Sequence, residues 1–310
     1  MIATLVLTAG LGTRLDPLTR LLAKAAVPFG DRTLIEHVLA GLSMQGVRDV
    51  VLNLHHRPAS ITAVVADGRH LGLLVRYSWE QPLLGSAGGP RHALGLLNSD
   101  PFLIVNGDTL CDVDIRALIA RHNERRALVT MAVVPNPAPD HYNGIVANDR
   151  DEITGFVPRG RADGTWHYVG YQVVQASVFA ALPDGVPAET VAGIYRELVA
   201  AEPGRLGVFR LNKPFLDVGT PRDYLETARV LRARNTSAVQ AMNELAAPSI
   251  IWPDAQVAPD ANLHGCIVAG PVSVPAAFVA SGKVIVPASV ATPEDRAEIR
   301  SDLAIFSIET

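Results

Sequence analysis

The chain has 310 residues, of which 48% are hydrophobic and 19% charged, and its formal net charge at pH 7 is −4. This composition is typical of a globular protein with one large domain and a small one, and it excludes a disordered chain. The negative balance argues against nucleic acid as a partner, because such binders carry a basic surface. Two cysteines are too few for a zinc site.

We expect a cytoplasmic location and no membrane partner. No apolar run approaches the eighteen or so residues of a membrane helix, and the apolar stretch at the N-terminus is too short for a signal peptide. The cysteines, Cys111 and Cys266, are expected to be reduced thiols.

The first predicted strand, residues 2–7, runs into a glycine-rich loop that carries two cations. Gly10 and Gly12 leave the backbone N–H groups of the loop open to close approach, so that these groups can point at phosphate oxygens. Arg14 can fork onto one phosphate, and Lys24 can place a compact charge against another. A loop of this composition suits a triphosphate.

Two common phosphate loops do not match this segment. The P-loop pattern G-x-x-x-x-G-K-[ST] is absent, and the dinucleotide fingerprint fails because Leu15 stands where a third glycine belongs. Pro17 and Thr19 also interrupt any helix that would begin at once. The glycines alone leave an ordinary tight turn open as an alternative.

The longer string resembles the signature of the sugar-1-phosphate nucleotidylyltransferases, G-x-G-T-R-L-x-P-L-T followed by a lysine and a proline. The matching residues are Gly10, Gly12, Thr13, Arg14, Leu15, Pro17, Leu18, Thr19, Lys24 and Pro28. The resemblance extends over about residues 2–235 and implies catalytic roles for Arg14 and Lys24.

Short apolar runs alternate with helical stretches in the first half of the chain. The predicted strands are residues 50–54, 73–77, 102–105 and 129–134, and the predicted helices are 34–44, 59–66, 88–97 and 115–125. This alternation predicts an α/β, Rossmann-like fold, with a mostly parallel mixed sheet and helices on both faces. Ligands of such sheets bind beyond the carboxyl ends of the strands.

Residues 80–89 resemble the family segment E-x-x-x-L-G-T-A-G-G, with Ser86 in place of threonine. The resemblance implies that this segment lies along the nucleobase and the sugar of the nucleotide. Glu80 could accept two hydrogen bonds from guanine, whereas Gln81 could instead pair with uracil. A plain loop that starts a helix remains the alternative. With the glycine-rich loop, the predicted nucleotide-binding residues are Ala9, Gly10, Gly12, Thr13, Glu80, Gly85, Ala87 and Gly107.

Two aspartates follow apolar strands. Asp108 ends the run 102–106 through Asn106 and Gly107, and Asp217 ends the run 215–217. Each can be a Mg²⁺ ligand or an ordinary residue of a turn or strand end. The resemblance favours the first interpretation for both, with Asp108 also counted among the catalytic residues and Mg²⁺ as cofactor.

The middle of the chain is expected to add antiparallel strands at 144–147, 153–157 and 167–174 and a helix at 189–201. Its string 156–160 loosely resembles a family segment that binds the sugar phosphate, with Arg159 where a lysine is usual and Pro158 replacing a glutamate. The cation is retained and a sugar-hydroxyl acceptor is lost. The predicted sugar-phosphate-binding residues are Asn143, Gly144, Arg159 and Gly170. A solvated loop arginine is the alternative for Arg159.

Thr220 is predicted to cap a helix that has Pro221 at its first position and runs to about residue 234. Beyond residue 245, Ile251, Val257 and Leu263 recur every six residues. This spacing resembles the coils of a left-handed parallel β-helix, with a proline-rich strand meander as the alternative. Residues 293–300 are predicted to form a short helix.

These observations predict a catalytic domain at 1–240, a β-helix-like region at 247–290, and a terminal helix and tail at 291–310. The resemblance implies an enzyme that makes an NDP-sugar and pyrophosphate from an NTP and a sugar 1-phosphate, with GTP and mannose 1-phosphate or a related sugar as first choice. Uridylyl transfer to glucose 1-phosphate or N-acetylmuramate 1-phosphate stays open. So does a non-catalytic regulatory subunit that binds a nucleotide-sugar. A homodimer or higher homo-oligomer is a further hypothesis.

Overall fold

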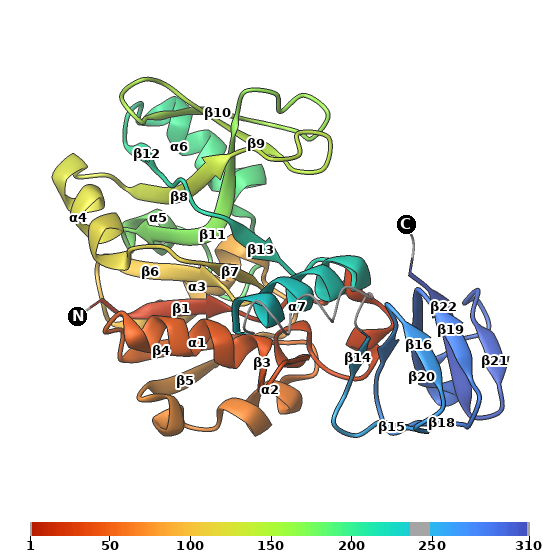
Figure 1. Cartoon of the computed structure of the whole chain (residues 1–310). Helices are drawn as coiled ribbons and strands as arrows, with labels where there is room; N and C mark the ends of the chain where they lie inside the picture. The colour runs from red at the N-terminus through yellow and green to blue at the C-terminus, as the bar shows by residue number, and fades with distance from the viewer. Residues whose placement is uncertain (1, 236–248, 309–310) are drawn as a thin grey trace. The chain divides into compact units, whose positions relative to one another are not determined.

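The structure, a computed structural model, describes residues 2–235 and 249–308 (Figure 1). The chain divides into two compact units. Unit 1 contains the described residues up to Gly10 together with Ile35–Leu216, and unit 2 contains Leu11–Leu34 together with the described residues from Asp217 onward. The predicted domain boundaries at 240 and 247 lie outside the described residues.

Unit 1 is built on a nine-stranded mixed sheet with the main order β10-β9-β11-β6-β1-β4-β5. Its strands are β1 (Thr4–Leu7), β4 (Asp49–Leu54), β5 (Leu74–Trp79), β6 (Phe102–Asn106), β8 (Val129–Pro135), β9 (Gly144–Ala147), β10 (Ile153–Val157), β11 (Trp166–Val174) and β12 (Leu206–Arg210). The four strands β6, β1, β4 and β5 are parallel, while β11 runs antiparallel to β6, β8 and β9. The predicted α/β class and largely parallel sheet are confirmed.

Helices separate the parallel strands of unit 1, as the alternation predicted. They are α1 (Leu34–Met44), α2 (Pro58–Val65), α3 (Gly85–Leu97), α4 (Ile115–Arg125), α5 (Ser177–Ala180) and α6 (Tyr195–Ala201). α4 begins where a carboxylate can cap it, since Asp114 Oδ1 accepts from the amide of Ala117 at 3.0 Å. α3 begins three residues earlier than predicted, at Gly85, whose positive φ turns the chain into the helix.

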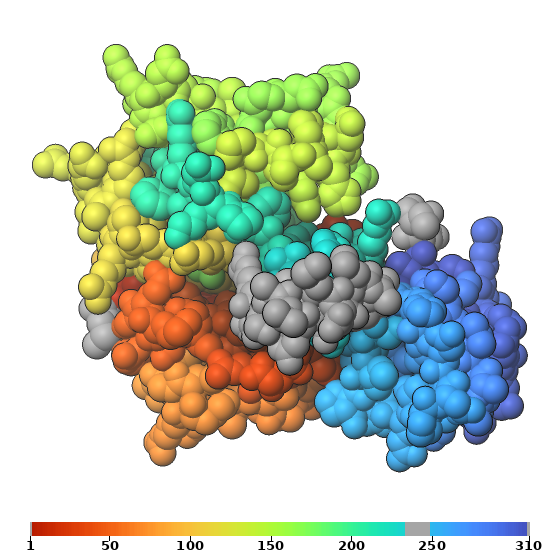
Figure 2. Space-filling view, viewed as in Figure 1, coloured from red at the N-terminus to blue at the C-terminus, as the bar shows by residue number. Residues whose placement is uncertain are grey.

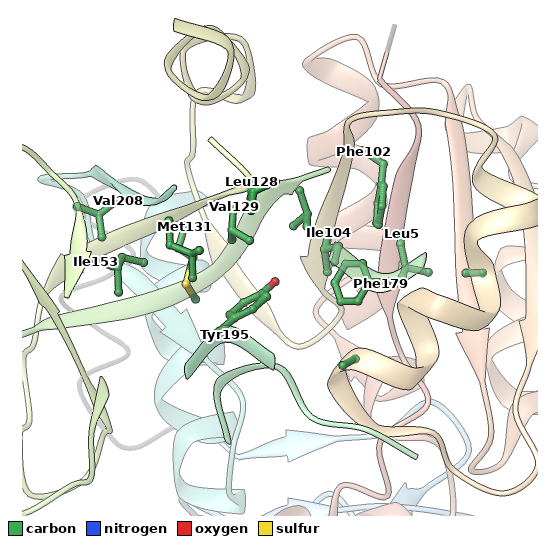
Figure 3. Packing of buried hydrophobic residues seen from close by; sticks show 14 of the residues in the cluster. Leu5, Phe102, Ile104, Leu128, Val129, Met131, Ile153, Phe179, Tyr195 and Val208 are labelled. Atoms are coloured by element: carbon green, nitrogen blue, oxygen red, sulfur yellow. The ribbon is translucent and has the colours of Figure 1, made fainter. Parts of the chain in front are cut away.

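An apolar core of unit 1 lies between the sheet and its helices. Figure 3 shows the ring of Tyr195 near Met131 and Val129, and Phe179 close to Ile104. The rings of Phe102 and Phe179 are 6.0 Å apart. The Tyr195 hydroxyl donates to Gln172 Oε1 at 2.8 Å, which satisfies two buried polar groups inside this core.

The glycine-rich loop of unit 2 contains no α-helix, as Pro17 predicted. It makes three single 3₁₀ turns, η1 (Thr13–Leu15), η2 (Leu18–Arg20) and η3 (Lys24–Ala26), followed by the hairpin of β2 (Pro28–Phe29) and β3 (Arg32–Thr33). Leu15, Leu18 and Val27 are fully buried, and they anchor the loop in unit 2.

The cap predicted at Thr220 is confirmed at the start of α7 (Pro221–Asn235). Thr220 Oγ1 accepts from the amide of Asp223 at 3.2 Å, and Asp223 Oδ2 accepts from the amide of Thr220 at 2.9 Å. This is a reciprocal capping box with aspartate in the third position. α7 follows β13 (Phe215–Asp217), a short strand that pairs with β7 (Thr109–Cys111).

Three short parallel ladders follow α7 in unit 2. β14 (Ile250–Ile251), β17 (Ile267–Val268) and β20 (Lys283–Pro287) form one, β15 (Gln256–Val257) and β18 (Ser273–Val274) the second, and β16 (Asn262–His264) and β19 (Val279–Ser281) the third. Ile250 pairs with Ile267, and Ile267 with Val284, so each partner lies seventeen positions further along. The six-residue spacing therefore places one aliphatic residue in each ladder. Residues 250–308 are coloured in shades of blue and lie together in Figure 2.

The helix predicted at 293–300 is wrong. The chain instead forms a hairpin of β21 (Glu298–Arg300) and β22 (Leu303–Ser307), and β22 pairs antiparallel with β20. Leu303 and Ile305 alternate into the apolar cluster that lines the ladders, and Ser301 takes a positive φ at the turn. A two-residue period that buries these side chains overrides the weak helical tendency of the polar stretch before it. The last two residues of the predicted tail lie outside the described part.

No helix within the described residues combines the length and apolar character needed to cross a membrane.

Candidate active site

The end of β1 is fixed by an asparagine that was not predicted as a site residue. Asn53 Oδ1, at the end of β4, accepts from the amides of Thr8 at 2.6 Å and Ala9 at 3.3 Å. The Thr8 hydroxyl donates to the Asn53 carbonyl at 2.5 Å. Because Asn53 is only 3% exposed, these bonds are made away from water and set the direction in which the chain leaves the sheet.

The same asparagine holds Glu80, whose side chain is also buried. Asn53 Nδ2 donates to Glu80 Oε1 at 2.7 Å, and Glu80 Oε2 accepts from the amide of Leu84 at 2.8 Å. The Glu80 amide donates to the carbonyl of Leu54 at 2.8 Å. Glu80 therefore links the loop after β1 to the start of α3. Its predicted contact with a nucleobase stays a prediction, since both carboxylate oxygens already accept hydrogen bonds within unit 1.

The first turn of α3 is covered by residues 188–190. The amides of Ala87 and Gly88 both donate to the carbonyl of Ala188, and a Cβ on Gly85 would stand 2.6 Å from Glu189 Oε1. Ser86 Oγ donates to Glu189 Oε2 at 2.5 Å. Gly85 is thus required by its surroundings, and the nucleotide contacts predicted for Gly85 and Ala87 stay predictions.

Asp108 lies in the tight turn between β6 and β7, beside the end of β1. The Gly107 amide donates to the carbonyl of Leu7 at 3.0 Å, and a Cβ on Gly107 would stand 2.7 Å from Thr8 Cγ2. No larger residue fits at position 107. The structure therefore brings the predicted residues Ala9, Gly107 and Asp108 together at the carboxyl ends of two neighbouring parallel strands.

Tyr168 on β11 adds a buried hydroxyl to this region. Its oxygen has no hydrogen-bond partner among the residues that the structure describes. Burial, with smaller contributions from Tyr195 and Asp108, raises the pKa of the Tyr168 phenol well above its ordinary value. The hydroxyl stays protonated at neutral pH, and an unpaired buried hydroxyl favours a polar ligand group over an apolar one.

The four predicted sugar-phosphate residues fall into two local arrangements. Asn143 Oδ1 accepts from the amide of Arg159 at 3.0 Å, and the side chains of both residues are exposed. Buried Gly144 follows directly. Gly170, with a φ of +83°, lies where the pairing of β11 with β8 shifts, and a Cβ there would stand 2.9 Å from Asn106 Cβ. Gly170 thus packs against the strand that leads to Asp108.

The turn at residues 10–12 has backbone N–H groups that are available to a ligand. The amides of Gly10, Leu11 and Gly12 make no hydrogen bond with any residue between 2 and 235 or between 249 and 308. Gly12 has a φ of +64°, and a Cβ on it would stand 3.0 Å from Lys24 Cβ. The lysine side chain therefore packs against the turn that contains these amides, an arrangement compatible with a phosphate loop.

Arg14 and Asp217 meet around Gly219 in unit 2. A Cβ on Gly219 would stand 3.2 Å from Arg14 Nη1, 3.3 Å from Asp217 Oδ2 and 2.9 Å from Asp223 Oδ2. Arg14 is exposed and Thr13 beside it likewise, whereas Asp217 is half-buried. The predicted loop cation and the predicted second metal ligand are thus neighbours, although 203 positions of chain separate them.

The donor chemistry of Asp108 and Asp217 suits a hard divalent cation. Within the described residues there is no cluster of three or more His, Cys, Asp or Glu side chains that could hold a metal. Magnesium does not need such a cage, because it keeps several waters and binds through one or two carboxylates together with substrate phosphates. Either carboxylate therefore fits a metal that arrives with a polyphosphate.

A family model described as nucleotidyl transferase matches residues 3–234. The chain belongs to this nucleotidyl transferase family, and the family predicted from the loop signature is confirmed. Members of the family generally use a divalent metal, and an NTP and a sugar phosphate fit as its substrates.

Curated relatives extend the match. A mannose-1-phosphate guanylyltransferase of Mycobacterium tuberculosis is 27% identical over 266 residues, which cover 86% of this chain and 74% of that protein. A mannose-1-phosphate guanyltransferase of Candida albicans is 31% identical over 231 residues, 71% of this chain and 62% of that protein. The chain thus spans somewhat less than two thirds of the length of the fungal relative.

Solved structures support the same fold. HddC from Yersinia pseudotuberculosis, crystallised in complex with GMP-PN, matches with a TM-score of 0.65 and 20% identity, over 74% of this chain and 100% of that chain. UDP-glucose pyrophosphorylase from Acinetobacter baumanii matches with a TM-score of 0.66 and 21% identity, over 79% of this chain and 98% of that chain.

Proposed function

We propose that this chain transfers a guanylyl group from GTP to mannose 1-phosphate, or to a closely related sugar 1-phosphate, and releases pyrophosphate. The observation that carries the proposal is the loop at 10–24, with open amides at Gly10–Gly12 and Lys24 packed against Gly12. The choice of guanine and mannose rests on the names of the relatives. It does not rest on Glu80, whose carboxylate is engaged by Asn53 and Leu84.

The reaction is a displacement at the α-phosphorus of the nucleotide. The sugar phosphate oxygen attacks in line, the bond to the β-phosphate oxygen breaks, and pyrophosphate leaves with the electron pair. No general base is required, because the attacking oxygen is already anionic. Catalysis then consists of alignment and neutralisation of charge. In this proposal Lys24 offsets charge at the α-phosphate, while Arg14 and the amides of residues 10–13 hold the leaving pyrophosphate.

Asp108 and Asp217 are the proposed ligands of a divalent cation, with Mg²⁺ as the ion best suited to two carboxylates and phosphate oxygens. The bound ion would neutralise charge on the phosphates. On the sugar side, Asn143, Arg159 and the buried Tyr168 hydroxyl supply an amide, a cation and a donor for the sugar phosphate.

The test is pyrophosphate release with four NTPs crossed with a panel of sugar 1-phosphates that includes mannose, glucose and N-acetylmuramate. The highest kcat/KM is expected for GTP with mannose 1-phosphate. A preference for UTP would overturn the base assignment and favour a uridylyltransferase. Binding of an NDP-sugar by calorimetry, with no turnover for any pair, would overturn the enzyme in favour of a regulatory subunit.

Four finer points belong to the same proposal. We take residues 1–240 as the catalytic domain and the ladders of 247–290 as a left-handed β-helix. The parallel pairing at a constant seventeen-residue offset supports this interpretation of the ladders. A location in the cytoplasm and a homo-oligomer complete the proposal, and a monomeric mass by light scattering at working concentration would remove the oligomer.

A further inference from the structure

Arg20 stands in the glycine-rich loop between the two proposed phosphate ligands, Arg14 and Lys24. All five of its N–H donors are used. Nε donates to Asp16 Oδ1 at 2.8 Å, Nη1 to the carbonyl of Val290 at 3.1 Å, and Nη2 to Asp295 Oδ1 at 2.9 Å. Two more bonds, Nη1 to Asp295 and Nη2 to Asp16, complete a fork on each carboxylate. Arg20 therefore joins the loop to a segment 275 positions away.

Asp295 is itself held in place. Its Oδ2 accepts from the amide of Thr292 at 2.6 Å, and its side chain is 14% exposed against 26% for Arg20. The hydrogen bond from Arg20 is the main cause that lowers the pKa of Asp295, and the bond to Asp295 is the main cause that raises the pKa of Arg20. Both groups are charged at neutral pH. A bidentate, partly buried pair of this kind fixes orientation more strongly than an exposed single contact.

Two further contacts within unit 2 fix the same stretch of loop. A Cβ on Gly270, which has a φ of +82°, would stand 3.1 Å from Leu21 Cδ1, so this side chain packs against the backbone that precedes β18. The Tyr224 hydroxyl of α7 donates to the carbonyl of Pro28 and accepts from Trp252 Nε1 at 3.2 Å. The loop is thus attached on both sides of Lys24 to the second half of the chain.

We propose that Arg20 and Asp295 are positioning residues: the segments after residue 249 hold the phosphate loop in its binding shape and thereby set the affinity for the triphosphate. The inference rests on the proposed function, since it assumes that Arg14 and Lys24 contact an NTP. Neither Arg20 nor Asp295 needs to touch the substrate. The alternative is a pair that only fastens the C-terminal hairpin.

The variant that tests this is Asp295→Asn, which keeps the size of the side chain and removes its charge. KM for GTP is expected to rise about tenfold, which is the size of effect seen for groups that orient a ligand-binding residue without touching the ligand. The kcat, and KM for the sugar phosphate, are expected to change by less than about twofold. Amide hydrogen exchange within residues 11–28 is expected to accelerate. Asp295→Glu keeps the charge, so its KM for GTP and its exchange within residues 11–28 should stay close to those of the wild type. The matched control is Glu298→Gln, which removes a partner of Arg300 on the same hairpin without contacting the loop.

Unchanged exchange in residues 11–28, with faster exchange confined to residues 288–307, would overturn the proposal. So would a KM for GTP equal to that of the Glu298→Gln control. If Asp295→Asn does not fold, Arg20→Lys is measured instead, because lysine keeps the charge but loses the forks on Asp16 and Asp295. Unchanged loop exchange in that variant together with a wild-type KM contradicts the coupling. The exchange experiment needs no turnover. A wild-type chain with no transferase activity therefore defeats the proposed function, while the exchange data still decide whether Asp295 controls the loop.

Discussion

The two units hold their site residues by different physical means. In unit 1, Thr8, Ala9 and Leu84 are fixed by Asn53 and Glu80, whose side chains are 3% and 4% exposed. In unit 2, the loop with Arg14 and Lys24 is fixed by the partly exposed pair of Arg20 and Asp295. Removal of one partner from a buried network leaves another group unpaired at high cost, whereas a partly hydrated pair can be loosened more cheaply. Substitutions in the buried network of unit 1 are therefore expected to lower stability more than activity. Substitutions in the partly exposed pair of unit 2 are expected to lower activity more than stability.

The largest expected effect comes from removing one charged site residue in each unit. Lys24→Ala in unit 2 and Asp108→Asn in unit 1 should each lower kcat by about a hundredfold, or on the order of 3 kcal/mol in the barrier. In the proposed function, Lys24 offsets charge on the reacting phosphates and Asp108 holds the divalent cation that does the same. Pyrophosphate release under saturating substrates measures it. Arg229→Ala and Asp184→Asn are controls of matching charge that touch no proposed site residue. Wild-type turnover in either site variant would contradict its role.

Asn53→Ala tests the buried network of unit 1. The change leaves the amide of Thr8 and a carboxylate oxygen of Glu80 without their partner, so the free energy of unfolding should fall by about 2–3 kcal/mol. Urea denaturation followed by circular dichroism measures this. The exposed Asn212→Ala is the control and should change it by less than about 0.5 kcal/mol. A loss no larger than that of the control would show that water replaces the network.

A decrease in pH should also distinguish the units. Burial lowers the pKa of His122 in α4 to about 4, so the unfolded chain takes up this proton first and stability falls as pH drops from 6.5 toward 4. Between pH 7 and pH 5 the loss is on the order of 2 kcal/mol. Asp295 behaves oppositely. Because its pKa is lowered from 3.8 in the folded chain, its charged form stabilises the fold at every pH above 3.8, and this contribution is lost only in stronger acid. The pair with Arg20 should therefore survive at pH 5.

Urea melts at pH 7 and pH 5 check this, with His122→Gln as the comparison. The variant should show a smaller pH dependence, because Gln cannot be protonated in this range. An equal pH dependence in both proteins would assign the effect to other groups, among which His167 is the first candidate, since burial also lowers its pKa to about 4.

The smallest expected effect concerns the cap of α7 in unit 2. Thr220→Ala removes the side-chain acceptor for the amide of Asp223 and should cost about 1 kcal/mol of unfolding free energy. Thermal unfolding measures it, and Thr62→Ala within α2, where no cap is lost, is the control. A kcat that fell as much as for Lys24→Ala would show that the cap positions Asp217 as well.

Much of unit 1 could be predicted because its signals are local. The alternation of β-branched runs and amphipathic stretches gave β4, β6, β8 and α4 nearly to the residue, and Thr220 with Pro221 gave the start of α7. The prediction of a terminal helix was wrong because Leu303 and Ile305 are buried in a hairpin against strands that come earlier in the chain.

The site residues show the same difference between local signals and contacts over long stretches of chain. Glycines, an arginine and a lysine in a compact string carry a phosphate signal that can be recognised without a fold. The partner of Arg20 cannot be found this way, since nothing in the sequence distinguishes an aspartate 275 positions away from a surface charge. Asn53 could have been noticed as a single polar residue inside an apolar strand. Glu80 was predicted to contact a nucleobase, which stays a prediction, and its bonds to Asn53 and Leu84 were not foreseen.

The attachment of the loop to Asp295 has a consequence for biosynthesis. A ribosome makes residues 11–28 long before it adds Asp295, the residue whose carboxylate fastens them. The nascent sheet of unit 1 can assemble meanwhile, because its pairings close over shorter stretches of chain. Competence to retain a nucleotide should then arise late, and a nascent polypeptide stalled before residue 295 should emerge with its sheet formed and its phosphate loop still unfastened.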